Sequence, residues 1–264
     1  MTKFVKGALL AGVVSLALVS LASAQAVSDL EFKCQAGVNK AGAKFVGAKS
    51  KCISKCLVNA GKLLNPYTDC FPPYGGTTAT CINDVVLLKG AENKFQAAII
   101  KACTLDCPEC YNGGDCSASG FAGDQVANIE GQVDSFVPGV ACEQPGADAA
   151  ETKCELNTAK VLSKQVGSLN KCVDKCKSNE RKALIAAGSC DPITDPATLT
   201  CVSLADGKTI AAVNKLCGDV GAIPDCSGTD DYPSGAAWTG LVDFAILGNV
   251  PTTYCASPSG AFIQ

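Results

Sequence analysis

The chain has 264 residues, of which 47% are hydrophobic and 18% charged, and it contains 18 cysteines but no histidine. Without an imidazole it cannot supply a Ser-His-Asp or Cys-His nucleophile pair, a histidine-ligated zinc or a Cys-x-x-Cys-His haem attachment. The low charged fraction and the high apolar fraction argue against intrinsic disorder. The composition therefore predicts a folded, cysteine-rich protein and does not indicate a particular reaction.

The first 24 residues have the pattern of a secretory signal peptide. Two lysines precede an uncharged run at residues 7–21, and Ala22 and Ala24 are the small residues that cleavage after Ala24 requires. We expect removal of residues 1–24 and a secreted, periplasmic or extracellular mature protein without a transmembrane segment. In an exported chain, an even number of cysteines predicts that all of them form disulfides.

An internal repeat organises the cysteines. A shift of 120 residues places five of them on five others without a gap, and three further pairs correspond after the second copy becomes six residues shorter. We predict two tandem homologous disulfide-rich domains, at residues 25–147 and 148–264. Cys107 and Cys116 have no counterparts and are expected to pair with each other. The cysteines expected to form disulfides are Cys34, Cys52, Cys56, Cys70, Cys81, Cys103, Cys107, Cys110, Cys116 and Cys142 in the first half and Cys154, Cys172, Cys176, Cys190, Cys201, Cys217, Cys226 and Cys255 in the second.

Each half is predicted to be a three-helix unit, so the fold class is mainly α. A capping box opens the first helix, as Ser28-x-x-Glu31 in one half and Asp148-x-x-Glu151 in the other. This helix is expected to run for about 35 residues. It would end at Pro66 in the first half and at Gly188 in the second.

The glycines at positions 37, 42 and 47 leave room for a bend in the first of these long helices. Second helices are expected before Cys103 and Cys217, and third helices within residues 124–137 and 236–247. Strand evidence is thin, because pieces such as residues 77–82 are short and isolated. An antiparallel first and second helix would bring Cys34 near Cys103, and Cys52 or Cys56 near Cys81.

A regular series of lysines is the most specific feature of the two long helices. Its spacing of 7, 4, 7, 4 and 7 residues is identical in both halves and keeps the side chains within about 60° of one helical face. Residues 33–64 hold seven lysines and no acid, whereas residues 65–152 hold three lysines and twelve acids. We name these series the lysine ridges: Lys33, Lys40, Lys44, Lys51, Lys55 and Lys62 form the first, and Lys153, Lys160, Lys164, Lys171, Lys175 and Lys182 the second.

Other groups of residues are weaker evidence for a redox or metal site. Cys107-Pro108-Glu109-Cys110 has the spacing of a redox dithiol, but it follows a predicted helix instead of a strand, and Ile223 replaces Cys107 in the second copy. The loop carboxylates Asp225, Asp230 and Asp231 do not fit the alternating EF-hand pattern. We expect no cofactor and no metal site.

The function predicted from these features is that of a non-enzymatic structural or interaction protein outside the cytoplasm or at the cell surface. Its partner would be a second copy of itself or an anionic component of the cell envelope. Nucleic acid is a poor partner, because the net charge is −3 and the chain has few aromatic residues. Two alternatives remain: a module that binds an anionic ligand through the lysine ridges, and a hydrolase with a carboxylate pair such as Asp191 with Asp195 or Asp230 with Asp231.

Overall fold

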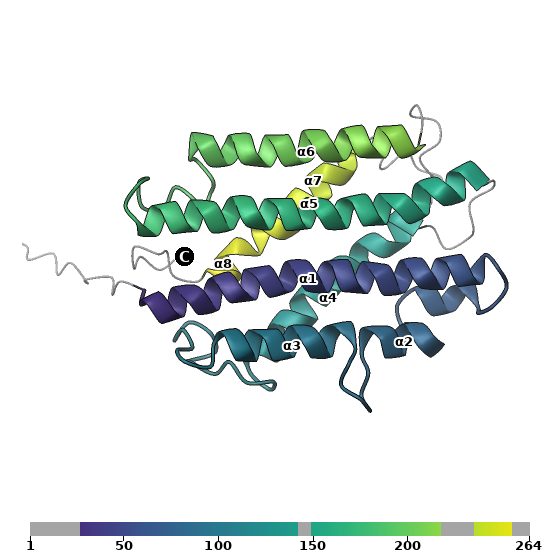
Figure 1. The fold of residues 1–264 in the computed structure, drawn as a ribbon, viewed down its shortest axis with the longest axis horizontal. Coiled ribbons are helices and arrows are strands. Elements are labelled where there is room, and N and C mark those ends of the chain that lie inside the picture. The colour runs from purple at the N-terminus through teal and green to yellow at the C-terminus, as the bar shows by residue number, and fades with distance from the viewer. Residues whose placement is uncertain (1–26, 142–148, 218–234, 255–264) are drawn as a thin grey trace, which may run out of the picture.

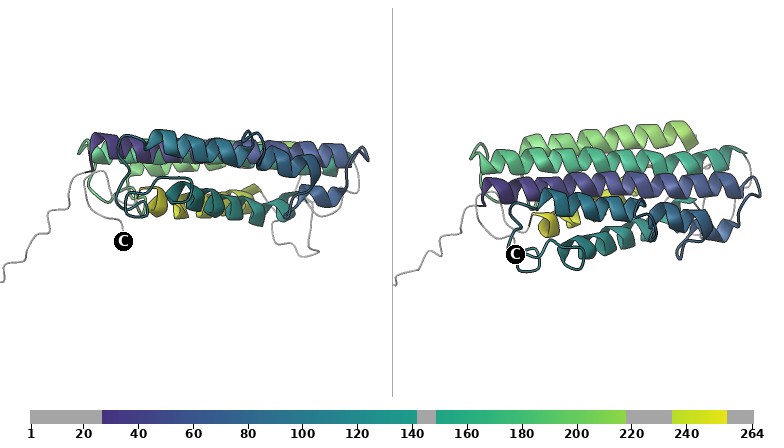
Figure 2. Two further views of the ribbon diagram at one scale, coloured as in Figure 1. Left: turned by 90° about the horizontal axis from the view of Figure 1, so that it is seen from below. Right: turned by 60° about the horizontal axis from the view of Figure 1, so that its bottom comes forward.

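The helices form two layers (Figures 1 and 2). The computed structural model describes residues 27–141, 149–217 and 235–254, which are mainly helical and contain no β-strand. The front layer places α6 (Pro196–Cys217), α5 (Ala149–Arg181), α1 (Asp29–Ala60) and α3 (Ala91–Ala102) side by side, with α2 (Gly76–Ile82) in line with α3. The 3-10 turn η1 (Tyr67–Cys70) contacts α1 and α2. The back layer consists of α4 (Phe121–Ala141), α7 (Gly235–Gly248) and the single turn α8 (Val250–Thr253). None of the described helices is long and apolar enough to cross a membrane.

The capping box predicted for the first helix is confirmed. The Ser28 hydroxyl accepts the Glu31 backbone N–H at 3.0 Å, and the Glu31 carboxylate accepts the Ser28 N–H at 2.7 Å. These reciprocal bonds satisfy two of the amides that a helix start leaves without a partner. The corresponding cap at Asp148 lies outside the described residues.

The ends of the two long helices differ from the prediction. They stop at Ala60 and Arg181, before Pro66 and Gly188 are reached. The Leu64 N–H bonds the Asn59 carbonyl and the Leu184 N–H bonds the Asn179 carbonyl, each at 3.0 Å. Just before each bond, Leu63 (φ 58°) and Ala183 (φ 53°) adopt the left-handed conformation. This is the Schellman ending, with Leu and Ala at a position where glycine is usual.

Two glycines of α1 let neighbouring helices approach closely. The helix runs unbroken through all three candidate bend positions. A Cβ at Gly37 would lie 2.5 Å from the Cβ of Ala102 in α3, and a Cβ at Gly42 would lie 3.0 Å from Ile129 in α4. A Cβ at Gly47 would meet nothing within 4 Å. Contact with α3 and α4, not a bend, therefore explains the first two glycines.

Disulfides tie each long helix to the segment that follows it. The predicted proximity of Cys34 to Cys103 is confirmed as a disulfide, and so is the extra pair Cys107–Cys116. Of the two cysteines expected near Cys81, Cys52 forms the disulfide with it. The described residues contain no free cysteine. The sequence separations of 29 and 14 residues recur in both halves. The disulfides with both partners described are Cys34–Cys103, Cys52–Cys81, Cys56–Cys70, Cys107–Cys116, Cys154–Cys217, Cys172–Cys201 and Cys176–Cys190.

The six-residue difference between the halves falls in the second helical segment. In the second half α6 is continuous, whereas the corresponding segment of the first half is divided into α2 and α3 by residues 83–90. The third helices are found where they were expected, as α4 and α7. Residues 77–82, which read as weak strand, belong to helix α2 because the segment packs beside α1 and is joined to it by the disulfide at Cys81.

The two halves share one hydrophobic core. Phe45, Phe95 and Ile129 of the first half belong to the same buried cluster as Leu169 and Trp238 of the second. The antiparallel helices α1 and α5 lie in contact at the centre of the front layer. The predicted division at residues 147 and 148 falls outside the described residues, so the division into two domains stays a prediction.

Two glycine substitutions on α1 test the close approach to α3. Gly37→Ala is expected to lower the free energy of unfolding by about 1–3 kcal/mol, because its methyl group overlaps Ala102. Gly47→Ala is expected to raise it by about 0.5–1 kcal/mol, because the site is open and alanine favours helix. Urea unfolding of the oxidised proteins measures both values. Equal effects at the two positions would contradict the proposed helix contact.

Candidate functional site

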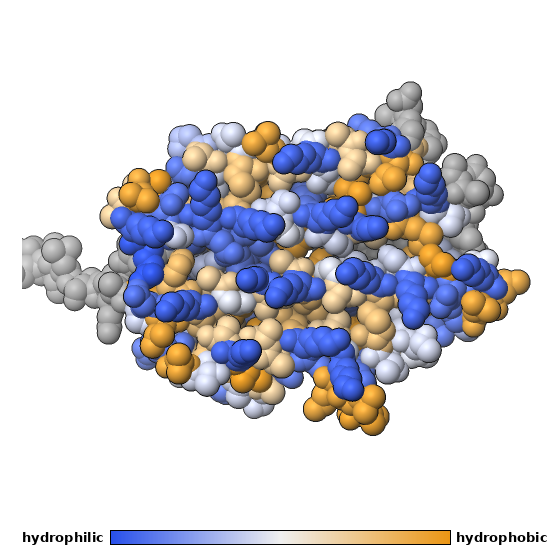
Figure 3. All heavy atoms as spheres, in the orientation of Figure 1, coloured by the Kyte–Doolittle hydropathy of each residue, from blue (hydrophilic) through white to orange (hydrophobic). Residues whose placement is uncertain are grey.

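The lysine ridges form two rows on the outer face of the front layer. All twelve lysines are exposed, as their spacing predicted. Because α1 and α5 are neighbours, the two rows lie side by side, and Figure 3 shows the hydrophilic side chains over both helices. Lys94 and Lys101 of α3 and Lys208 and Lys215 of α6 are exposed as well. We call the exposed surface of these four helices the basic face.

Acidic side chains on these four helices are turned inward or paired. Among residues whose exposure is described, Asp29 is the one exposed acid of α1, α3, α5 and α6, and it forms an ion pair with Arg181. Glu155 and Glu180 are buried. Asp174 accepts a hydrogen bond from Asn39, at 2.6 Å, and another from Tyr254 of the other layer. The basic face therefore carries little compensating negative charge.

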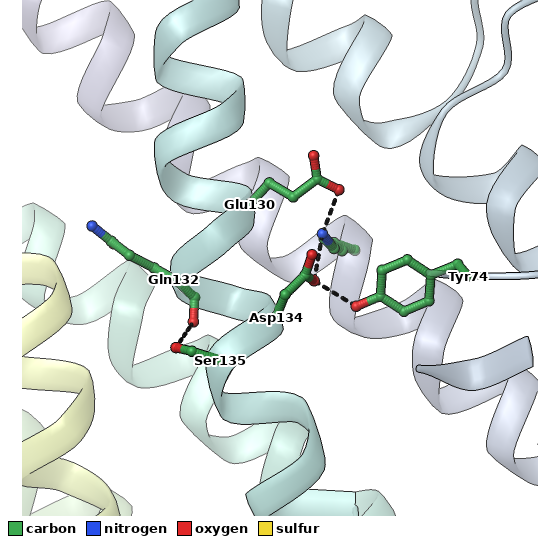
Figure 4. Close-up of polar contacts among 6 residues, drawn as sticks. Tyr74, Glu130, Gln132, Asp134 and Ser135 are labelled. Carbon is green, nitrogen blue, oxygen red and sulfur yellow. Dashed lines mark hydrogen bonds and ion pairs between the residues drawn. The ribbon is translucent and has the colours of Figure 1, made fainter. Parts of the chain in front are cut away.

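A buried lysine that is not part of the ridges sits behind this face. The side chain of Lys49 is fully buried, and its Nζ lies 2.6 Å from both Glu130 and Asp134 of α4. The Tyr74 hydroxyl donates to Asp134 at 2.5 Å, and the Tyr74 ring centroid lies 5.0 Å from the ammonium. Figure 4 shows Tyr74, Glu130 and Asp134 pointing toward one another. This cluster joins α1 to α4 and to the segment before α2.

Two pairs of hydrogen-bonded carboxyl groups connect the layers. Burial, together with the hydrogen bond and charge of Glu130, raises the pKa of Glu92 to about 7, while the charge of Lys49 opposes the shift. In the second half, burial and the neighbouring Asp206 raise the pKa of Asp243 to about 6. Gln165 of α5 donates to Asp206 at 3.0 Å and to Asp243 at 3.1 Å. Each pair therefore holds a back-layer helix to a front-layer helix.

The carboxylates considered for hydrolysis have separate structural surroundings. Asp195 accepts hydrogen bonds from the Thr198 hydroxyl at 2.6 Å and from its N–H at 2.8 Å, which lowers the Asp195 pKa and caps α6. Burial raises the pKa of Asp191, although the nearby Lys177 opposes this. Lys177 is itself buried, 3.4 Å from Glu180, and burial lowers its pKa. Asp225, Asp230 and Asp231 lie outside the described residues.

The Cys107-x-x-Cys110 motif does not present two thiols. Cys107 pairs with Cys116, and Cys110 is disulfide-bonded as well. The sulfurs of Cys34, Cys103 and Cys116 lie within 4.8 Å of one another, which is the spacing of metal ligands. All three belong to disulfides, so this cluster offers no thiolate to a metal ion.

The loop that divides α2 from α3 exposes four large apolar side chains. Val85, Val86, Leu87 and Leu88 are between 63% and 82% exposed. The Asp84 carboxylate accepts the N–H groups of Val86 at 3.1 Å and Leu87 at 2.8 Å, so the loop is held by its own hydrogen bonds. Contiguous exposed apolar side chains of this kind mark contact surfaces more often than single ones do. Sequence reasoning missed this loop, although its apolar run coincides with the length difference between the halves.

Comparison with protein-family models, with curated proteins and with solved structures found no match for the chain. The evidence for the candidate site is therefore its geometry.

Alkylation tests the oxidation state of the scaffold. Treatment of the denatured but unreduced protein with a thiol-specific reagent is expected to add no label, because every cysteine of the described residues is disulfide-bonded and the others are predicted to be. Intact mass before and after reduction measures this directly. Labelling of Cys107 and Cys110 without reduction would contradict the structural role of these residues.

Stability should fall as pH rises through the range in which Glu92 ionises. The folded-state pKa of about 7 lies above the ordinary value of 4.5, so the stabilising contribution of the protonated group is complete below about 4.5 and is lost as pH rises through about 7. Glu92→Gln should make urea stability less dependent on pH across this window, because the amide stays neutral.

Glu109→Gln is a matched control for this experiment, because it makes the same chemical change at an exposed loop position. Asp243 contributes a similar dependence through about pH 6, which should remain in the Glu92→Gln protein. Identical pH profiles for the parent protein and Glu92→Gln would refute the half-buried acid pair.

Proposed function

We propose that this chain is a non-enzymatic, extracellular interaction protein whose basic face binds an anionic polymer. The observation that carries the proposal is the pair of lysine rows, each with five lysines on one of the adjacent helices α1 and α5 and a sixth in the turn that follows it. These lysines are exposed without exposed acids among them, apart from Asp29. Disulfides throughout the described part and the absence there of a membrane-spanning helix are compatible with an extracellular location. The signal-peptide pattern adds to this, although residues 1–24 lie outside the described residues.

An anionic polymer is favoured over a second copy of this chain. Self-association through the lysines needs an acidic surface of matching extent. Many of the described acids are instead used internally: Glu130 and Asp134 contact Lys49, Asp84 and Asp195 cap backbone segments, and Asp206 pairs with Asp243. The predicted homology of the two halves fits this function, since duplication would place two equivalent ridges beside each other.

A hydrolytic role has less support. Glycosidases keep their two carboxyl groups roughly 5 Å or more apart, so that the scissile bond fits between them. Here the acid pairs Glu92–Glu130 and Asp206–Asp243 are hydrogen-bonded directly, and Asp195 is occupied in capping α6. Their raised pKa values follow from burial between helices, which is also found in structural pairs.

Substitution of four ridge lysines tests the proposed interaction. A variant with Lys40, Lys44, Lys51 and Lys55 each changed to Gln should bind immobilised dextran sulfate about tenfold or more weakly at low salt, because several weak ion pairs are lost together. The affinity of the parent protein should fall steeply with salt concentration, and the slope should be smaller for the variant.

The same four positions changed to Arg provide the matched control, because charge is kept and affinity should be close to that of the parent. Uncharged dextran controls for binding to the polymer backbone. Circular dichroism should show the same helix content in all three proteins. Salt-independent binding, or equal binding of the Gln variant, would mean that the ridges are only a solvated surface.

A further inference from the structure

An apolar cavity lies between the two layers, away from the lysine rows. Four helices line it, with α1 and α5 contributed by the front layer and α4 and α7 by the back layer. The cavity is partly open to solvent. The cavity therefore lies where the two halves of the chain meet.

The front-layer side of the cavity is an apolar stripe along two antiparallel helices. Val46, Ile53 and Leu57 lie on one side of α1, and Leu162 and Val166 on one side of α5. From Val46 to Leu57 the stripe extends over about 16 Å, at a rise of about 1.5 Å per residue. The cavity is thus elongated along the helices.

The back-layer side is apolar as well. Ile129 and Val133 of α4 face the cavity together with Trp238 and Val242 of α7. The sequence shift of 109 residues that aligns the third helices places Ile129 on Trp238 and Val133 on Val242. Equivalent positions of the two halves therefore form the back wall of the cavity together.

The lining selects against polar and charged ligands. Its polar residues are Ser50, Gln132 and Ser163, and no lining residue carries a charge. Transfer of a charged group into such a site without a partner is strongly unfavourable. An apolar ligand gains the dispersion contacts that the lining atoms of an empty cavity lack.

We propose that this cavity binds a single linear hydrocarbon chain, such as a fatty acyl chain. The apolar stripe of about 16 Å between four helices suits an extended chain, whereas a compact apolar ligand would fill only part of the cavity. The polar end of the ligand remains at the open side, because no charged lining residue receives it. This site is independent of the basic face and does not rest on the function proposed for the lysines.

The tryptophan in the cavity wall provides a direct reporter. Trp238 is the one tryptophan of the chain, and it is 2% exposed. Undecanoic acid carrying a terminal bromine should quench its fluorescence, because bromine quenches an indole that it contacts. The quenching should saturate near one ligand per chain, and unbrominated dodecanoic acid should reverse it. Bromopropionic acid has the same functional groups but a short chain, so it should give no saturable quenching.

Two alanines of the lining allow the cavity to be filled from opposite sides. Ala159→Leu with Ala245→Leu should weaken chain binding about tenfold or more, by occupying space that the ligand needs. Ala97→Leu on the exposed side of α3 is the matched control and should leave affinity unchanged.

A series of saturated acids tests the shape of the site without any variant. Affinity should increase with chain length until the chain fills the cavity, and should then level off. This arm remains decisive if the filled variant does not fold. Absence of saturable quenching in the parent protein, equal affinity of a correctly folded filled variant, or affinity that ignores chain length would each overturn the proposal.

Discussion

The register between each long helix and the segment after it is fixed covalently, and much of the remaining structure depends on this. Disulfides leave α1 near its start, at Cys34, and again near its end, at Cys52 and Cys56. Each closed loop of this size contributes roughly 2–4 kcal/mol. The alignment of the helices therefore does not rely on core packing alone. The fold tolerates features that cost stability elsewhere, including two fully buried lysine side chains, hydrogen-bonded acid pairs and an apolar cavity.

Local signals in the sequence were sufficient for some features of the fold. The capping box at Ser28 acts within four residues, so it fixes the start of α1 whatever lies around it. The cysteine spacing anticipated the pairs that an antiparallel helix pair requires. The helix ends could not be read in the same way, because Leu63 and Ala183 occupy positions where glycine would have signalled the turn. Gly37 was ambiguous, since close approach and bending both select a residue without a side chain.

Local sequence patterns likewise predicted some residues of the candidate sites and not others. The ridge lysines were predictable, because their period matches the helix and places them on its outer face. Lys49 departs from that period, but its partners Glu130 and Asp134 lie more than 80 residues away, and no local pattern connects them. The cavity is still less accessible to sequence reasoning. It arises where four helices from both halves meet, and any one of its lining residues reads simply as core.

The two candidate sites occupy opposite sides of the central helices, yet they share a mechanical connection. The outer faces of α1 and α5 carry the lysines, and their inner faces line the cavity. The back wall of the cavity is formed by α4 and α7, and one acid pair contributes to the attachment of each of these helices to the front layer. Protonation strengthens these attachments and ionisation weakens them, since two carboxylates in contact repel. Occupation of the cavity and the pH of the surroundings therefore act on the same helices, whereas salt acts on the lysine rows. Measurements at fixed pH with varied salt, and at fixed salt with varied pH, separate the two sites.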